Sequence, residues 1–320
     1  MTAKCKLLCL IGPTAVGKTA TSIKLAHAFN GEIISGDSMQ IYKQMDIGTA
    51  KIKQAEMQGV PHYLIDIKQP TESFSAAEFQ ELVREKISEI TSRGKLPIIV
   101  GGTGLYIQSV LFDYQFSEAP SNDEFRHSLE EQAEKKGNLF LHNQLMKYDS
   151  ESAEKIHPNN VRRVIRALEI YHCTGKTMSE WQETQTPEPL YDAAVIGLTM
   201  EREQLYERIN QRVDIMMHEG LLNEVKQLFQ QGIRNCQSIQ AIGYKELYEY
   251  LEGKVSLDEA VANLKQNSRR YAKRQLTWFR NKMDVEWFDM TAATERHERE
   301  KKITEIFSYI EGKLKIKSNT

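Results

Sequence analysis

The chain has 320 residues and a formal net charge of −2 at pH 7, and 40% of its residues are hydrophobic and 27% charged. This composition excludes a chain that is disordered or collagen-like throughout, and the near-zero charge excludes a protein that is basic over its whole surface. The length allows two domains, or one core with a large insertion. The four cysteines form no Cys-x-x-Cys pair, and no apolar run approaches the ~18–20 residues that span a bilayer, so we expect a soluble, cytoplasmic protein without a zinc site.

Short apolar runs alternate with helical stretches along the first part of the chain. The continuous run Leu7–Ile11 predicts a strand that is buried on both faces, as in a parallel sheet. Further strands are expected at 32–35, 63–67, 96–100, 193–198 and 285–288, with helices at 19–29 and 76–92 among them. This alternation predicts an α/β fold with a doubly wound parallel sheet and right-handed crossovers.

The pattern changes between residues 116 and 189. This stretch is charged and helical in its periodicity, and no clear strand candidate interrupts it. We therefore expect a helical insertion domain at 116–189, carried by an α/β core that is made of residues 1–115 and 190–320.

A long basic helix is expected near the C-terminal end of the core. Ser256 and Glu259 have the spacing of a capping box, which predicts a helix that reaches about Asn281. Between residues 265 and 282 there are seven positive charges and no acidic residue. Five of these side chains fall in one arc of roughly 140° on the helix: Arg269, Arg270, Lys273, Arg274 and Arg280. Solvated faces usually mix both signs, so this arc favours an anionic partner.

A phosphate-binding loop follows the first strand. Its sequence is Gly12-Pro13-Thr14-Ala15-Val16-Gly17-Lys18-Thr19, which matches G-x-x-x-x-G-K-[ST] in the strand-to-helix context that the motif requires. The loop's N–H groups and the helix N-terminus attract phosphate, Lys18 adds a positive charge, and the Thr19 hydroxyl can bind magnesium. The motif predicts a phosphate ligand and leaves open whether this is a nucleotide or a prenyl diphosphate.

Two further motifs should lie at the same edge of the sheet. The block Asp37–Lys51 follows the second strand, and its first carboxylate can act as a general base, bind magnesium or merely cap a helix. The block Gly101–Tyr106 follows a later strand and is either a second ligand-facing glycine turn or a plain tight turn.

The combination of blocks resembles the tRNA dimethylallyltransferases, also called tRNA isopentenyltransferases, from about Leu7 to Phe288. The matching blocks are Gly12–Thr19, Asp37–Lys51, Gly59–His62, Gly101–Tyr106, Ile156–Asn159, Arg163–Glu169, Gly243–Glu246 and Arg269–Arg280. Two positions depart from the family: Tyr63, where many members have His, and Asn160, where many have Asp. Neither is expected to carry the chemistry.

The resemblance implies a P-loop NTPase-like fold and transfer of a dimethylallyl group from dimethylallyl diphosphate to the exocyclic N6 amine of an adenosine. That adenosine lies immediately 3′ of the anticodon in tRNA, and diphosphate is released. By the same resemblance Asp37 is the catalytic base, and Thr103 is a catalytic residue near the reacting centre. Ser38, Met39 and Gln40 would surround the flipped base, and Gln40 could read its edge. The backbone N–H groups of Thr14 to Thr19, the Lys18 side chain and Mg²⁺ at Thr19 would stabilise the leaving diphosphate.

Several arginines are candidates for anion contacts. Arg208 and Arg212 share a helix face, and the resemblance implies that one or both face the diphosphate, although a solvated face would look the same. The tRNA anticodon stem-loop is expected to contact Asp37, Ser38, Met39, Gln40, Thr103, Arg126, Arg162, Arg163, Arg166, Lys273 and Arg274. For Arg162, Arg163 and Arg166, ordinary surface charge is an equally good interpretation.

Two other functions remain open from the residues alone. A small-molecule kinase would share the phosphate loop and the α/β core, but it would explain neither the Asp37 block nor the basic helix. A nucleotide-dependent RNA-binding module would not need the Asp37 carboxylate. We expect a monomer without a membrane partner.

Overall fold

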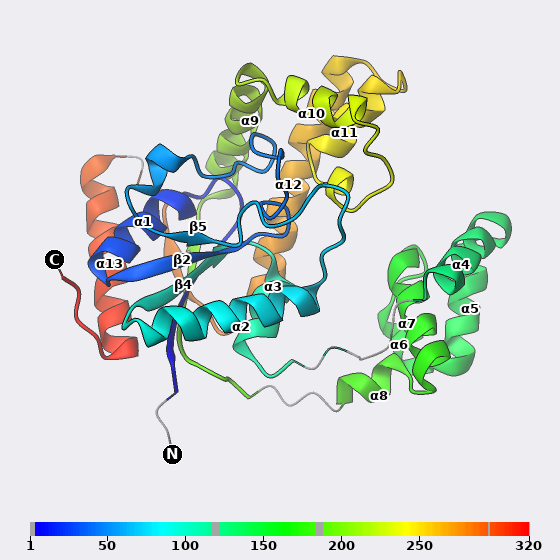
Figure 1. Ribbon diagram of the computed structural model, residues 1–320, viewed down its shortest axis with the longest axis horizontal. Helices are drawn as coiled ribbons and strands as arrows, with labels where there is room; N and C mark the ends of the chain where they lie inside the picture. The colour runs from blue at the N-terminus through cyan, green and yellow to red at the C-terminus, as the bar shows by residue number, and fades with distance from the viewer. Residues whose placement is uncertain (1–3, 115, 117–121, 184–187, 294, 320) are drawn as a thin grey trace. The chain divides into compact units, whose positions relative to one another are not determined.

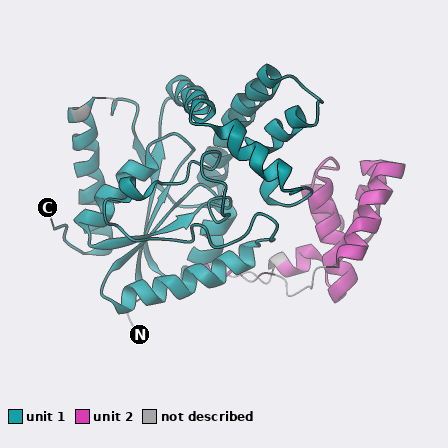
Figure 2. Ribbon diagram, turned by 45° about the horizontal axis from the view of Figure 1, so that its top comes forward, with its two compact units in different colours: residues 1–111, 189–320 teal, residues 112–188 magenta. Residues whose placement is uncertain are grey.

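The computed structural model describes residues 4–114, 116, 122–183, 188–293 and 295–319. The chain forms two compact units, which Figure 2 shows in separate colours. We call residues 1–111 with 189–320 the core unit and residues 112–188 the insertion unit. The sequence predicts the insertion at 116–189, and parts of its predicted ends, 117–121 and 184–187, lie outside the described residues.

The core unit is built on a six-stranded sheet in which every pair of neighbours is parallel, in the order β3-β2-β4-β1-β5-β6. The strands are β1 (Lys6–Ile11), β2 (Gly31–Gly36), β3 (His62–Tyr63), β4 (Leu96–Gly101), β5 (Asp192–Thr199) and β6 (Glu286–Asp289). The predicted doubly wound parallel sheet is confirmed. The predicted strand at 63–67 is wrong in extent, because positive φ angles at Leu64 (60°) and Asp66 (56°) turn the chain away from extended pairing.

Helices cover both faces of this sheet (Figure 1). Helices α1 (Lys18–Ala28) and α13 (Arg296–Leu314) pack on one face, and α2 (Ala76–Ser92) packs on the other. Helix α2 has the bounds that the sequence predicts. The Ser75 hydroxyl accepts the Glu78 N–H at 3.1 Å, and four apolar side chains, Phe79, Val83, Ile87 and Ile90, lie buried at helical spacing.

The strand register brings three motifs to one edge. Ile11 of β1 and Gly36 of β2 both pair with Gly101 of β4, so these three strands end side by side. The phosphate loop, the Asp37 block and the glycine turn at 101–104 each follow one of these strand ends. A ligand site at the carboxyl edge of an open parallel sheet follows from this topology.

A helical extension of the core unit stands beside this edge (Figure 1). It comprises α9 (Arg202–His218), α10 (Leu221–Gln230), α11 (Tyr244–Leu251) and α12 (Leu257–Lys282), while the short α3 (Gly104–Leu111) follows β4. The predicted capping box starts α12, because the Ser256 hydroxyl accepts the Glu259 N–H at 3.3 Å and Glu259 accepts the Ser256 N–H at 2.8 Å. Among the described residues, no helix combines the length and apolar character that crossing a membrane requires.

The insertion unit is helical, as its periodicity predicts. Its helices are α4 (Asp123–Lys136), α5 (Asn138–Tyr148), α6 (Ser150–Lys155), α7 (Val161–Thr174) and α8 (Met178–Glu183). They enclose an apolar core of their own, in which Leu129, Leu141, Val164 and Leu168 are buried.

Candidate active site at the carboxyl edge of the sheet

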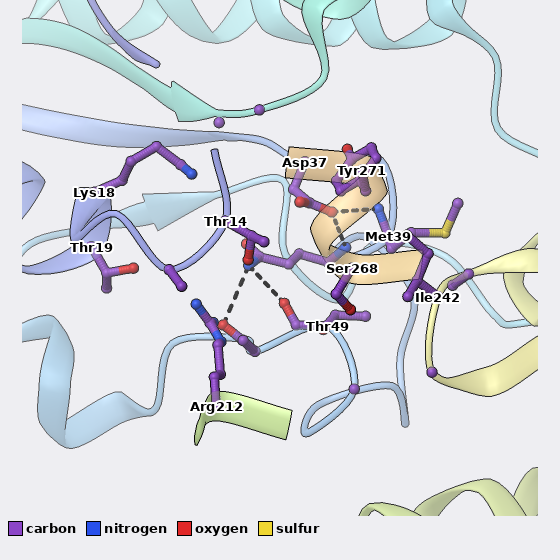
Figure 3. A pocket seen from close by; sticks show the side chains of 18 of the residues that line it. Thr14, Lys18, Thr19, Asp37, Met39, Thr49, Arg212, Ile242, Ser268 and Tyr271 are labelled. Carbon is purple, nitrogen blue, oxygen red and sulfur yellow. Dashed lines mark hydrogen bonds between the residues drawn. The ribbon is translucent and has the colours of Figure 1, made fainter. Parts of the chain in front are cut away.

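A cavity of about 630 Å³ lies at the carboxyl edge of the core unit (Figure 3). The phosphate loop, the Asp37 block, α9 and α12 line it. The labelled polar side chains that border it include Lys18, Thr19, Asp37, Arg212 and Tyr271. The structure therefore brings the predicted phosphate-binding and catalytic motifs into one cavity.

Lys18 is the buried cation of the phosphate loop. Its Nζ donates to the carbonyls of Gly12 (2.9 Å) and Pro13 (2.8 Å). Burial and the nearby Arg212 guanidinium lower the Lys18 pKa to about 7, and the Asp37 carboxylate partly opposes the shift. At neutral pH part of the Lys18 side chain is therefore the neutral amine, which gains a proton when an anion binds beside it.

The N–H of Thr14 does not point to the ligand side of the loop. It donates to Oε1 of Gln275 on α12 at 3.1 Å. This corrects the expectation that every N–H group of the loop from Thr14 onward is available to phosphate, because the Thr14 donor is already used. The backbone N–H groups that could bind phosphate are therefore those of residues 15–19.

The Asp37 carboxylate is held by its own turn. Oδ1 accepts the N–H of Met39 at 2.8 Å and of Gln40 at 3.3 Å (Figure 3). The described residues donate no hydrogen bond to Oδ2. Asp37 therefore combines a fixed orientation, given by one oxygen, with a second oxygen that can accept a proton from a substrate.

Gln40 borders the cavity, but its amide is engaged within the protein. Oε1 accepts the Ser35 hydroxyl at 3.0 Å, and Nε2 donates to the carbonyls of Thr49 (3.2 Å) and Ala50 (3.4 Å). This geometry argues against the expected base-reading role, because the amide edge is already occupied. Ser38 and Met39 do line the cavity as expected.

A contact that no motif indicates fixes the segment 46–48 of the Asp37 block. The Glu224 carboxylate accepts three consecutive backbone N–H groups, from Asp46 (2.8 Å), Ile47 (2.8 Å) and Gly48 (3.1 Å). The buried Tyr244 hydroxyl donates to the same carboxylate at 2.5 Å. The contact was missed because Glu224 lies more than 170 positions from residues 46–48 in the sequence.

The glycine turn after β4 packs against α12. A Cβ on Gly102 would lie 2.0 Å from Nε2 of Gln275, and one on Gly104 would lie 2.2 Å from the Trp278 ring, so both positions require glycine. The Thr103 hydroxyl between them is buried and makes no hydrogen bond to a described residue. Thr103 is not among the described residues that line the cavity, so its expected place near the reacting centre stays a prediction.

The two candidate arginines of α9 differ in position. Arg212 lines the cavity, and burial lowers the pKa of its guanidinium while Asp37 opposes the shift. The described lining does not include Arg208. Of the two arginines, Arg212 is therefore placed to face an anion in the cavity.

The basic arc of α12 is partly engaged by the core unit itself. Arg269 donates to Oδ1 of Asn210 at 2.6 Å, and Arg280 stacks over the Trp287 ring. Lys273 and Arg274 are exposed, and Arg274 also lines the cavity. Arg270 and Arg280 are exposed as well, so the charge available to a partner extends along the arc and borders the cavity at Arg274.

In the insertion unit, two of the candidate arginines meet a buried carboxylate. Glu169 accepts the Asn122 N–H at 2.8 Å and pairs with Arg126 (2.7 Å) and Arg166 (2.6 Å). Burial alone would raise the Glu169 pKa, but these three partners outweigh it and lower the pKa. The neighbouring Arg162 and Arg163 are exposed.

Comparisons with known proteins give the family. A model of the IPP transferase family matches residues 40–282. The tRNA dimethylallyltransferase of Anoxybacillus flavithermus is 65% identical over 314 residues, which cover 98% of this chain and 99% of the relative. That of Bacillus licheniformis is 66% identical over 310 residues, covering 97% and 98%.

Solved structures agree. The full-length tRNA isopentenylpyrophosphate transferase of Bacillus halodurans superposes with a TM-score of 0.74 at 55% identity, covering 98% of this chain and 97% of that one. A eukaryotic dimethylallyltransferase, described as acting on tRNA, gives a TM-score of 0.81 at 33% identity, covering 95% and 79%. The chain therefore belongs to the IPP transferase family.

Proposed function

We propose that this protein transfers the dimethylallyl group of dimethylallyl diphosphate to the exocyclic N6 amine of the adenosine immediately 3′ of the anticodon in tRNA, and releases diphosphate. The observation that carries the proposal is one cavity that holds a phosphate loop, the Arg212 guanidinium and the Asp37 carboxylate. The names of the relatives point to the same reaction.

The leaving group would bind at the phosphate loop. The N–H groups of residues 15–19, the Lys18 ammonium and Arg212 all face charge that grows on the diphosphate as the allylic C–O bond breaks. Donors and cations that are fixed in advance stabilise such charge without reorganising during the reaction. These groups lower the barrier to ionisation of the allylic carbon.

The acceptor amine would be deprotonated by Asp37. The turn at residues 37–40 holds Oδ1, so Oδ2 can take the proton that the N6 amine loses as its bond to the allylic carbon forms. Ser38 and Met39 border the cavity beside this carboxylate and would contact the flipped base.

We propose Mg²⁺ as the cofactor, with the Thr19 hydroxyl as the protein oxygen that would hold it. Oxygen donors suit this ion, and no group of three or more His, Cys, Asp or Glu ligands occurs among the described residues. The ion would therefore take its other ligands from the diphosphate and from water. When bound, it neutralises charge on the leaving diphosphate.

The anticodon stem-loop is proposed to contact both units. On the core unit, Lys273 and Arg274 are exposed on α12, and Arg274 lines the cavity; on the insertion unit, Arg162 and Arg163 are exposed on α7. Arg126 and Arg166 would contribute while paired with Glu169. We propose a monomer that works in the cytoplasm.

One experiment separates this function from a kinase. The protein is incubated with unmodified tRNA, MgCl₂ and dimethylallyl diphosphate, and digested nucleosides are examined by mass spectrometry for a prenylated adenosine. Parallel reactions contain ATP and candidate metabolites instead. Prenylated adenosine supports the proposal, whereas phosphate transfer from ATP without any prenylated product would overturn it.

A further inference from the structure

One stripe of α12 packs against the glycine turn at residues 101–104. Tyr271, Gln275 and Trp278 are spaced by four and three residues and so share a face of the helix. Gln275 and Trp278 face the glycines at 102 and 104 so closely that neither could carry a Cβ. The stripe is separate from the basic arc, which lies on another side of the same helix.

The Gln275 side chain is only 6% exposed, and its amide connects two motifs. Oε1 accepts the Thr14 N–H at 3.1 Å, and Nε2 donates to the Gly102 carbonyl at 3.0 Å. The first partner begins the phosphate loop and the second begins the turn that carries Thr103. Their sequence distances from Gln275 are 261 and 173 residues.

Both hydrogen bonds need an amide in one orientation. A carboxylate could accept from Thr14 but would face the Gly102 carbonyl with a second oxygen, and an apolar side chain would leave a backbone donor and acceptor unpaired in a buried place. Each unpaired buried group costs about 1–3 kcal/mol. The two backbone groups thus fix which atom of the Gln275 amide is oxygen.

We propose that Gln275 is a positioning residue of the transfer reaction, which holds the phosphate loop and the glycine turn at a fixed separation. It touches neither the reacting carbon nor the amine. Its role in catalysis rests on the proposed function, whereas its role in shaping the anion site does not. The tRNA contacts of the neighbouring basic arc should be independent of it.

The test compares Gln275→Met with Gln266→Met. Both replace a glutamine of α12 by a side chain of similar length, but Gln266 is exposed and serves as the matched control. Binding of inorganic diphosphate is measured by calorimetry, and transfer kinetics are measured with tRNA and dimethylallyl diphosphate. For Gln275→Met we expect diphosphate affinity about tenfold weaker, because a hydrogen bond anchoring the loop is lost. We also expect a lower kcat, a raised KM for the prenyl donor and an unchanged KM for tRNA, while Gln266→Met behaves as wild type.

A second variant keeps the test informative if Gln275→Met folds poorly. In Gln275→Glu, the protonated carboxyl group can reproduce both hydrogen bonds, because its O–H donates to Gly102 and its carbonyl accepts from Thr14. The ratio of variant to wild-type diphosphate affinity should therefore recover toward one as the pH falls. A ratio that does not change with pH, or a Gln275→Met protein that matches Gln266→Met, would overturn the inference.

Different results would overturn the proposed transfer reaction and the positioning role of Gln275. If the wild-type protein binds inorganic diphosphate but prenylates no tRNA, the proposed function is lost and the anion-site role of Gln275 is still tested by the calorimetry. If wild-type transfer is observed and Gln275→Met retains wild-type kinetics and affinity, only the positioning role is lost.

Discussion

At the scale of single residues, Lys18 shows how burial prepares the site for its ligand. Its pKa near 7, compared with 10.5 for an ordinary lysine, means that the ammonium is only partly protonated at neutral pH. A diphosphate beside Nζ favours the charged form and raises that pKa. Binding above pH 7 must therefore be coupled to proton uptake.

This coupling predicts how diphosphate binding depends on pH. The affinity should be greatest below pH 7 and should fall as the pH rises through 7, because the free protein then loses the Lys18 proton that the complex keeps. Calorimetry in buffers of different ionisation enthalpy measures the proton uptake directly. Lys18→Met is the control, since titration of diphosphate itself is common to both proteins. Equal pH dependence in the two proteins would contradict the assignment.

A second residue-level prediction concerns Asp37. Asp37→Asn keeps an oxygen that can accept the N–H groups of Met39 and Gln40, but it removes the base. We expect the rate of transfer in a single turnover to fall on the order of 10²–10⁴-fold, with little change in tRNA affinity. Filter binding and rapid-quench kinetics measure the two quantities. A variant as fast as wild type would exclude Asp37 as the base.

The sequence predicted individual site residues where a motif defines a turn. The cavity includes Lys18, Thr19 and Asp37 as expected, because loop motifs fix local backbone geometry. Gln275 was not predictable, because glutamine carries no motif and both of its partners are distant in the sequence. Gln40 was assigned to the substrate, since a motif does not show that its amide is already bonded to the backbone.

At the scale of elements, α12 has three faces that make different contacts. The stripe with Gln275 and Trp278 packs against the glycine turn at residues 101–104. On a second face, Ala272 and Phe279 are buried in the core. The basic arc occupies the third. The sequence predicted the last two faces from charge and hydropathy periodicity, but it gave no reason to expect the first, which depends on the approach of a glycine turn.

Two exposed residues of the basic arc, Lys273 and Arg274, give a prediction at this scale. Lys273→Glu with Arg274→Glu should weaken tRNA binding by at least about tenfold and reduce the slope of log affinity against log salt by about 2, one for each lost phosphate contact. The charge-matched control is Lys301→Glu with Lys313→Glu on α13, where both lysines are exposed. An unchanged slope in the α12 variant would show that the arc is merely solvated.

Periodicity also explains which element boundaries were predictable. Helix α2 begins and ends as expected because a serine cap and four buried positions agree. For α9, the spacing showed that Arg208 and Arg212 share a face, but a helix's rotation about its axis is set by tertiary packing. Of these two arginines, Arg212 is among the described residues that line the cavity and Arg208 is not.

At the scale of the whole molecule, the net charge of −2 hides a separation of charge. Exposed basic side chains gather on α12 in the core unit and on α7 in the insertion unit, while acidic residues elsewhere balance them. The parallel sheet and the helical nature of the insertion could be predicted from the alternation of strands and helices and from the point where it stops. The order of the strands could not. The contacts of Glu224 with residues 46–48, and of Glu169 with Asn122 and Arg126, could not be predicted, because they join segments that are distant in the sequence.

If both units contact the same tRNA, their contributions should combine. Arg162→Glu with Arg163→Glu should weaken tRNA binding, and adding the Lys273 and Arg274 changes should multiply the two losses, because distant contacts contribute independently. Affinities of the two pair variants and of the fourfold variant, measured at one salt concentration, test this. An insertion-unit pair with wild-type affinity would confine recognition to the core unit.

The close approach of aromatic rings to glycines at the site constrains how this chain can change over evolutionary time. A Cβ on Gly48 would lie 2.5 Å from the Tyr244 ring, and one on Gly104 would lie 2.2 Å from the Trp278 ring. Neither glycine can acquire a side chain while its ring stays in place, and a smaller residue in place of either ring would open a void. Drift at these positions must therefore proceed through paired replacements, and each pair should vary together among descendants or not at all.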